Sequence, residues 1–134
     1  MKNLIIVSII FILCACNKSN QIIKERISNA DSVAINYFKG DGTLDTVLAV
    51  KIIKDKKVLE NLSALISAKS AEANVACGYD GSLHFFKKNV VAQDIDFRMN
   101  DAGCMYFTFK QNGKNTATVL SAEAKQLLSS LKNN

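Results

Sequence analysis

The chain has 134 residues, a formal net charge of +5, and neither proline nor tryptophan. This length allows one domain with a single hydrophobic core. The lysines are scattered along the sequence, which argues against the dense basic patch of a nucleic-acid-binding protein.

The first residues have the pattern of a secretory signal peptide. Lys2 provides a short positive region, and residues 4–13 are apolar except for Ser8. A membrane-spanning helix needs about 20 apolar residues, so this run is too short to span a bilayer. It fits the hydrophobic region of a signal peptide, and we therefore expect residues 1–15 to be removed.

The apolar run is followed by Leu13-Cys14-Ala15-Cys16. This sequence resembles the lipobox of bacterial lipoproteins, which has a small residue just before the cleavage point and a cysteine just after it. The resemblance implies a diacylglycerol on the Cys16 thiol and an acyl chain such as palmitate on the new amine. Two or more acyl chains hold a protein stably on a membrane. An uncleaved anchor or an ordinary signal peptide is the alternative.

The residues after Cys16 carry a sorting signal by the same resemblance. In Gram-negative lipoproteins an aspartate directly after the lipidated cysteine retains the protein in the inner membrane, and here that residue is Asn17. Residues 17–21 also lack the acidic run of some surface-exposed lipoproteins of Bacteroidetes. We expect a lipid-anchored protein of the outer membrane that faces the periplasm. Its expected partners are the membrane and an envelope protein, and nucleic acid is not expected as a partner.

The four cysteines then leave one candidate pair. Cys14 leaves with the signal peptide and Cys16 carries lipid, so Cys77 and Cys104 remain. Exported compartments are oxidising, and we therefore predict a disulfide between them. A crosslink closing a loop of this length contributes roughly 3–4 kcal/mol to stability. Two free thiols are the alternative.

Residues 16–30 are mostly polar and are predicted to form a tether that can include a short helix, because isoleucines recur there at helical spacing. Residues 31–134 are predicted to form one domain. Residues 32–39 and 45–54 have the composition of two strands joined by a turn. Asp55 is predicted to cap a helix that extends to about residue 68, and a loop follows.

The second half has the pattern of a meander of strands and a final helix. The predicted strands are residues 82–87, 90–99, 104–111 and 114–120. Asn112-Gly113 favours a type I′ turn between the last two, and Ser121 is predicted to cap the helix. The order is ββαββββα. It predicts an α+β fold in which an antiparallel sheet forms one layer and two helices pack on one of its faces.

The strand at residues 90–99 shows a clear alternation of apolar and polar side chains. Ile95, Phe97 and Met99 should face the core, and the residues between them should face solvent. Neighbouring segments add further polar and aromatic side chains. The possible binding surface predicted in this way comprises Tyr79, Asp80, Asp94, Asp96, Arg98 and Tyr106.

The sequence contains no convincing catalytic, cofactor or metal motif. The single histidine, His84, lacks the activated serine motif of a hydrolase, and one histidine beside disulfide-bonded cysteines does not make a zinc site. Asp94 and Asp96 share a strand face and could do acid–base chemistry, but any solvated strand alternates in this way. We expect no cofactor and no enzyme. A hydrolase that uses His84 with a nearby aspartate is the alternative.

One further pattern surrounds the two cysteines. Residues 77–83 read Cys-Gly-Tyr-Asp-Gly-Ser-Leu, and residues 103–107 read Gly-Cys-Met-Tyr-Phe. The pair resembles a pattern in small uncharacterised lipoproteins of Bacteroidetes-type bacteria. The resemblance implies the disulfide and the exported compartment, and it implies no activity.

These observations together predict a lipid-anchored protein of the cell envelope that acts as a non-catalytic binding or accessory module. The alternative is a periplasmic inhibitor or immunity protein that blocks an envelope hydrolase or toxin. Such an inhibitor would use a projecting loop around Tyr79 and Asp80 to plug an active site.

Overall fold

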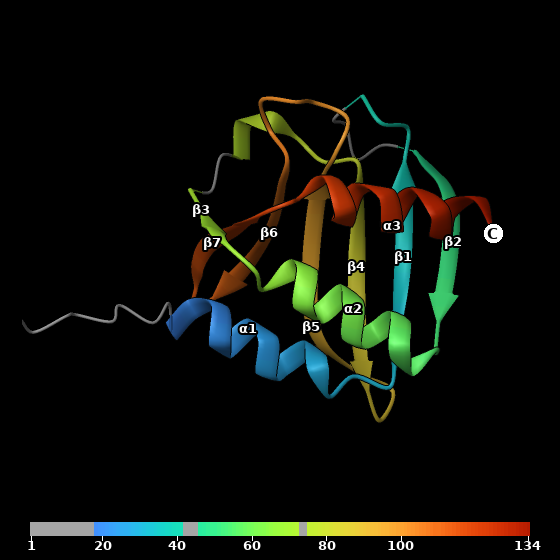
Figure 1. Ribbon diagram of the computed structural model, residues 1–134, viewed down its shortest axis with the longest axis vertical. Helices are drawn as coiled ribbons and strands as arrows, with labels where there is room; N and C mark the ends of the chain where they lie inside the picture. Colours follow the sequence, from blue (N-terminus) through green and yellow to red (C-terminus); the bar gives the residue numbers. More distant parts are fainter. Residues whose placement is uncertain (1–17, 42–45, 73–74) are drawn as a thin grey trace, which may run out of the picture.

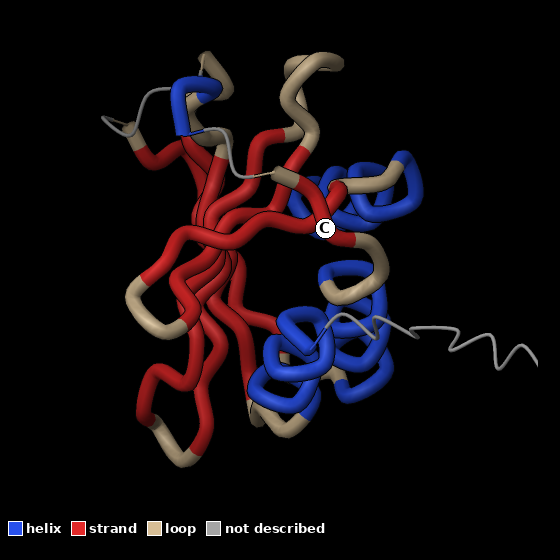
Figure 2. The backbone as a smooth tube through the Cα atoms, turned by 90° about the vertical axis from the view of Figure 1, so that its left-hand side faces the viewer, coloured by secondary structure: helices blue, strands red, loops and turns tan. Residues whose placement is uncertain are grey.

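The computed structural model describes residues 18–41, 46–72 and 75–134, and the predicted lipidation site Cys16 lies outside these residues. The described residues form an α+β fold. Seven antiparallel strands make one sheet in the order β2-β1-β4-β5-β6-β7-β3. The helices lie on one face of this sheet and leave the other face uncovered (Figures 1 and 2).

The bounds of the elements are as follows. The helices are α1 (Lys18–Ser28), α2 (Lys56–Ile66) and α3 (Ala122–Asn133), with a short 3-10 helix η1 (Val75–Cys77). The strands are β1 (Ser32–Phe38), β2 (Val47–Ile53), β3 (Ser70–Ala71), β4 (Gly81–Lys87), β5 (Val90–Arg98), β6 (Tyr106–Gln111) and β7 (Lys114–Val119).

The predicted order ββαββββα agrees with the structure from β1 to α3, but it omits α1, β3 and η1. A short helix was allowed in the predicted tether, and residues 18–28 form a regular helix of 11 residues that packs into the core. Ile23 and Ile27 are 1% and 0% exposed and belong to the core. Helix α1 packs against α2 and β5. The domain therefore begins in α1 and not at residue 31. The polar composition of this segment does not predict a packed helix, and burial of its apolar side chains stabilises the helix.

The core lies between the sheet and the helices. Successive side chains of a strand point to opposite faces, so every second residue of the central strands enters the core. From α2 and α3, Leu62 and Leu128 fill the same space and are 1% and 0% exposed. The largest core side chains of the central strands include Ile35, Leu83, Phe85, Ile95, Phe97 and Phe107.

The predicted helix caps and the predicted hairpin turn are confirmed. Asp55 Oδ1 accepts a hydrogen bond from the Val58 amide at 3.0 Å, and Ser121 Oγ accepts one from the Ala124 amide at 3.1 Å. Residues 112 and 113 have φ angles of 51° and 75°, as a type I′ turn requires at both central positions. Local sequence signals thus determine where α2, α3 and the β6–β7 hairpin begin.

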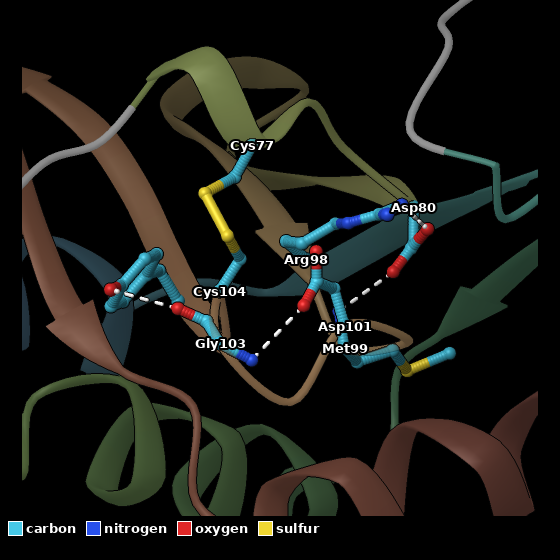
Figure 3. The surroundings of a disulfide bond; sticks show 8 residues. Cys77, Asp80, Arg98, Met99, Asp101, Gly103 and Cys104 are labelled. Atoms are coloured by element: carbon cyan, nitrogen blue, oxygen red, sulfur yellow. Dashed lines mark hydrogen bonds and ion pairs between the residues drawn. A yellow bond between two sulfur atoms is a disulfide. The ribbon is translucent and has the colours of Figure 1, made fainter.

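The predicted disulfide between Cys77 and Cys104 is confirmed, with a Cα–Cα distance of 5.9 Å. It joins η1 to the segment before β6 (Figure 3). The segment from residue 69 to 81 was predicted to be a loop, but it contains β3 and η1. Strand β3 pairs with β7 at the edge of the sheet, which gives this segment backbone hydrogen-bond partners.

Asp80 lies beside the disulfide and is buried, with 2% of its surface exposed. Its carboxylate forms an ion pair with Arg98 and accepts hydrogen bonds from the amides of Met99 and Asn100 at 2.7 and 2.8 Å. Figure 3 shows this carboxylate between Arg98 and the Met99 backbone. Asp80 therefore connects the start of β4 to the end of β5 and is a structural residue.

Candidate functional site

The uncovered face of the sheet has polar side chains at its centre. Cross-strand pairing places Asn36, Ser82, Asp96 and Thr108 in one row over β1, β4, β5 and β6. In the next row His84 of β4 lies directly opposite Asp94 of β5. Directly opposite residues have Cβ atoms about 5 Å apart, so their side chains can interact. We call this group the polar cluster; it comprises Asn36, Ser82, His84, Asp94, Asp96 and Thr108.

A chain of hydrogen bonds runs through the cluster. His84 Nδ1 lies 2.6 Å from Asp94 Oδ1, and His84 Nε2 lies 3.0 Å from Ser82 Oγ. Asn36 Nδ2 lies 3.1 Å from His84 Nε2 and donates to Ser82 Oγ at 3.3 Å. An ionised carboxylate can only accept, so the Nδ1 atom of His84 carries the proton. In the neutral imidazole, Nε2 is then an acceptor that faces the Ser82 hydroxyl.

Asp96 differs from Asp94 in its interactions, since Asp94 pairs with His84. The side chain of Asp96 is half-buried and makes no hydrogen bond or ion pair with any residue in the described part of the chain. Burial raises the pKa of the Asp96 carboxyl above its ordinary value of 3.8; the charge of His84 opposes this shift and that of Asp94 adds to it. Asp96 is therefore a carboxyl group without a hydrogen-bond or ion-pair partner among the residues that the structure describes.

Thr108 lies opposite Asp96 in the β5–β6 ladder and is 8% exposed. Its hydroxyl oxygen is buried and has no hydrogen-bond partner among the described residues. Leaving a buried polar group unpaired costs about 1–3 kcal/mol. Buried groups of this kind are uncommon in folded proteins. The described residues with such an atom are Ser63, Arg98, Thr108, Gln111 and Thr118, and of these only Thr108 lines the cleft described next.

Both groups line a cleft of about 600 Å³. The cleft forms because β5 and β6 pair only over a short stretch, which ends at the pair Asp96–Thr108. Beyond this pair the two strands diverge, and the β6–β7 hairpin bends away from β5 (Figure 1). The polar side chains along its walls include Arg26, Tyr79, Asp94, Asp96, Thr108, Lys110 and Asn115.

The residues of the predicted binding surface are divided between two environments. Asp94 and Asp96 line the cleft together with Tyr79, and Tyr106 occupies a half-buried position on β6. Arg98 has only 12% of its side chain exposed because it pairs with Asp80. Placing Asp80 on the surface was wrong, since its carboxylate is needed inside the fold by Arg98 and two backbone amides.

Sequence reasoning did not select Asn36, Ser82 or Thr108. The alternation of β4 does place Ser82 and His84 on one face, and this signal was available. There was no such signal for Asn36, because its place in the cluster depends on the pairing of β1 with β4, and these two strands are far apart in the sequence. Over the residues described, no group of three or more histidine, cysteine, aspartate or glutamate side chains could hold a metal ion.

Comparison with known proteins gives no match: no family model, no curated protein and no solved structure matches this chain. In the part of the chain that the structure describes, every helix is too short or too polar to cross a membrane.

Proposed function

We propose that the chain is a lipid-anchored protein of the cell envelope and that its domain is a binding module with its ligand site in the β5–β6 cleft. The lipobox-like sequence at Cys16 supports the attachment. Only Asn17 lies between this cysteine and the start of α1 at Lys18. The lipid would therefore hold the folded domain close to the membrane surface.

The observation that carries the proposal is the pair of unsatisfied groups in the cleft. Asp96 offers carboxylate oxygens and Thr108 offers a buried hydroxyl, and neither has a partner in the described protein. A ligand that donates hydrogen bonds to Asp96 and pairs with Thr108 would satisfy both. Binding would then recover the free energy that the unpaired, buried Thr108 hydroxyl costs in the unliganded protein.

The chemistry of the walls favours a hydroxylated, uncharged ligand. Asp94 and Asp96 are opposed by Lys110 and Arg26, so the cleft has no strong preference for either sign of charge. Carboxylate and amide groups accept and donate the hydrogen bonds that hydroxyl groups need. The ring of Tyr79 adds an apolar surface with a polar end. A saccharide unit of an envelope glycan combines these properties.

The test is calorimetric titration of the full chain, solubilised in detergent, with disaccharides prepared from peptidoglycan and from outer-membrane glycans. Asp96→Asn is expected to weaken binding about tenfold or more, and Thr108→Val about threefold to tenfold. Asp101→Asn and Thr116→Val are matched controls outside the cleft and should bind as the unchanged chain does. Absence of binding at millimolar saccharide, or equal losses in the two threonine variants, would contradict the proposal.

The inhibitor or immunity alternative is less well supported. It depends on a projecting loop around Tyr79 and Asp80, but Asp80 is buried and paired with Arg98. Tyr79 is half-buried and lines the cleft wall. These two side chains are better placed to maintain and line a cleft than to enter the active site of another protein.

A further inference from the structure

We propose that Ser82, His84 and Asp94 form a nucleophilic relay that hydrolyses ester bonds on the uncovered face of the sheet. This activity goes beyond ligand binding and does not depend on which ligand occupies the cleft. Nucleophilic catalysis by serine requires a base within hydrogen-bond reach of the hydroxyl and a third group that orients the base. The three side chains meet both requirements.

The distances match those of a working relay. Ser82 Oγ lies 3.0 Å from His84 Nε2, and His84 Nδ1 lies 2.6 Å from Asp94 Oδ1; both fall within the range of about 2.6–3.2 Å expected between such groups. Asp94 selects the Nδ1–H tautomer, which leaves Nε2 without a proton. This nitrogen is an acceptor for Asn36 Nδ2 at 3.1 Å and can take the proton of Ser82 Oγ. A serine relay is recognised by this geometry and not by the order of its residues in the chain.

The fold explains why these residues meet. Ser82 and His84 are two positions apart on β4 and therefore point to the same face. Asp94 stands opposite His84 on β5. Both strands lie in the interior of the sheet, with β1 on one side and β6 on the other, so the relay rests on rigid elements.

A substrate would approach from the side without helices (Figure 2). Ser82 is 5% exposed, and its short side chain lies between the longer side chains of Asn36, His84 and Asp96. The hydroxyl thus has little contact with solvent and is reached only between these neighbouring side chains. His84 keeps 32% of its side chain exposed and Asp94 keeps 68%, so the base can contact both substrate and water.

The oxyanion donor in this arrangement is Asn36. The backbone amides of these strands are engaged in the sheet, so a side chain has to supply the hydrogen bond that stabilises the developing charge. Asn36 Nδ2 carries two hydrogens and lies 3.3 Å from Ser82 Oγ and 3.1 Å from His84 Nε2, so the developing oxyanion takes the place of one of these two acceptors. A single side-chain donor suits esters, whose alkoxide leaves more readily than the nitrogen of an amide.

The reaction proceeds in two halves. Ser82 Oγ bonds to the ester carbonyl carbon as its proton passes to His84 Nε2, and the carbonyl electron pair moves to the oxygen that Asn36 contacts. The C–O bond to the alcohol then breaks, and the alcohol leaves with the proton from His84. Water attacks the acylated serine in the same manner, and the proton returns to Ser82 Oγ. The net change is ester and water to acid and alcohol.

The first experiment is labelling of the full, detergent-solubilised chain with a fluorophosphonate probe, followed by mass spectrometry of the modified peptide. We expect the label on Ser82. Ser82→Ala should abolish it, and His84→Gln should lower the labelling rate by about 10²–10⁴-fold. Ser130→Ala, at an exposed serine of α3, is the matched control and should label normally.

The second experiment measures hydrolysis of p-nitrophenyl acetate by the same variants. Asn36→Ala is expected to lower kcat by about 10²–10³-fold, as loss of one oxyanion donor does. Asp94 is a positioning residue, so Asp94→Asn should lower kcat while KM stays unchanged. Unaltered circular dichroism and thermal unfolding of each variant exclude loss of the fold as the cause.

The relay is wrong if the intact chain labels no faster than Ser82→Ala, or if Ser82 and Ser130 label equally. Thr108→Val separates this proposal from the ligand site, because it should weaken saccharide binding and leave the labelling of Ser82 unchanged. A variant that loses saccharide binding but labels normally concerns only the ligand site. A variant that loses labelling but binds saccharide normally concerns only the relay.

Discussion

The two faces of the sheet are built from the same strands but are stabilised in different ways. On the helix side, side chains such as Phe85 and Phe97 are 0% exposed and need only apolar neighbours. On the uncovered side, the polar cluster relies on cross-strand hydrogen bonds, and the Thr108 hydroxyl has no hydrogen-bond partner in the described part of the chain. At the edge of that side, Val50 and Ile52 of β2 stay exposed at 56% and 68%. Apolar burial is thus concentrated on one face, and hydrogen-bonding side chains are concentrated at the centre of the other.

The largest effect should come from the covered face. Phe97→Ala removes a fully buried ring and is expected to lower the free energy of unfolding by about 3–5 kcal/mol. Val50→Ala, on the exposed edge strand, should change it by less than about 0.5 kcal/mol. Denaturant titration of both variants measures the difference. Similar losses would show that the uncovered face is buried in the working protein.

A comparable effect is expected at the end of the sheet. Asp80→Ala removes the partner of Arg98 and the acceptor of two amides, so the free energy of unfolding should fall by about 3–5 kcal/mol. Asp101→Ala removes an exposed carboxylate that accepts from the Gly103 amide at 3.0 Å. This control should cost about 1 kcal/mol or less. Equal costs would contradict the structural role assigned to Asp80.

The disulfide should contribute a little less. Replacing both Cys77 and Cys104 with alanine is expected to lower the free energy of unfolding by roughly 3–4 kcal/mol, because the crosslink limits the unfolded chain. Reduction of the unchanged chain should give the same loss, and reduction of the double variant should give none. An additional loss on reducing the double variant would be inconsistent with this pair being the stabilising disulfide.

The smallest effect should have the opposite sign. Folding raises the pKa of Asp96, so the folded protein favours the protonated carboxyl, and stability falls as pH rises from 3.8 through the raised pKa. Asp96→Asn removes this fall and should raise the melting temperature at pH 7. At a pH well below 3.8 the variant and the unchanged chain should melt alike. A lower melting temperature at pH 7 would mean that Asp96 has a stabilising partner.

The sequence predicted the elements whose signals are local. The Asp55 and Ser121 caps, the Asn112-Gly113 turn and the alternation in β5 each depend on a few neighbouring residues. The isoleucine spacing indicated a short helix in the α1 segment, but it did not indicate that this helix belongs to the core, because that depends on burial of Ile23 and Ile27 against distant segments. Short-range patterns contain no information on such packing.

The candidate site was less predictable than the fold for a related reason. Its hydrogen bonds depend on β1 lying beside β4, although β2 and α2 intervene in the chain. Its cleft depends on where the pairing of β5 and β6 stops. Alternation alone identifies the face of Ser82, His84 and Asp94, but it does not determine the register that brings Asn36 and Thr108 into the same rows.

Because α1 begins at Lys18, the distance between the cleft and the proposed lipid attachment site is short. An α-helix rises about 1.5 Å per residue, so Arg26 at the cleft lies only about 12 Å along α1 from Lys18. With lipid on Cys16, as proposed, the cleft would work within a few nanometres of the bilayer surface. Its ligands would then be molecules found beside the membrane, and a longer spacer inserted after Cys16 would extend the zone that the domain can sample.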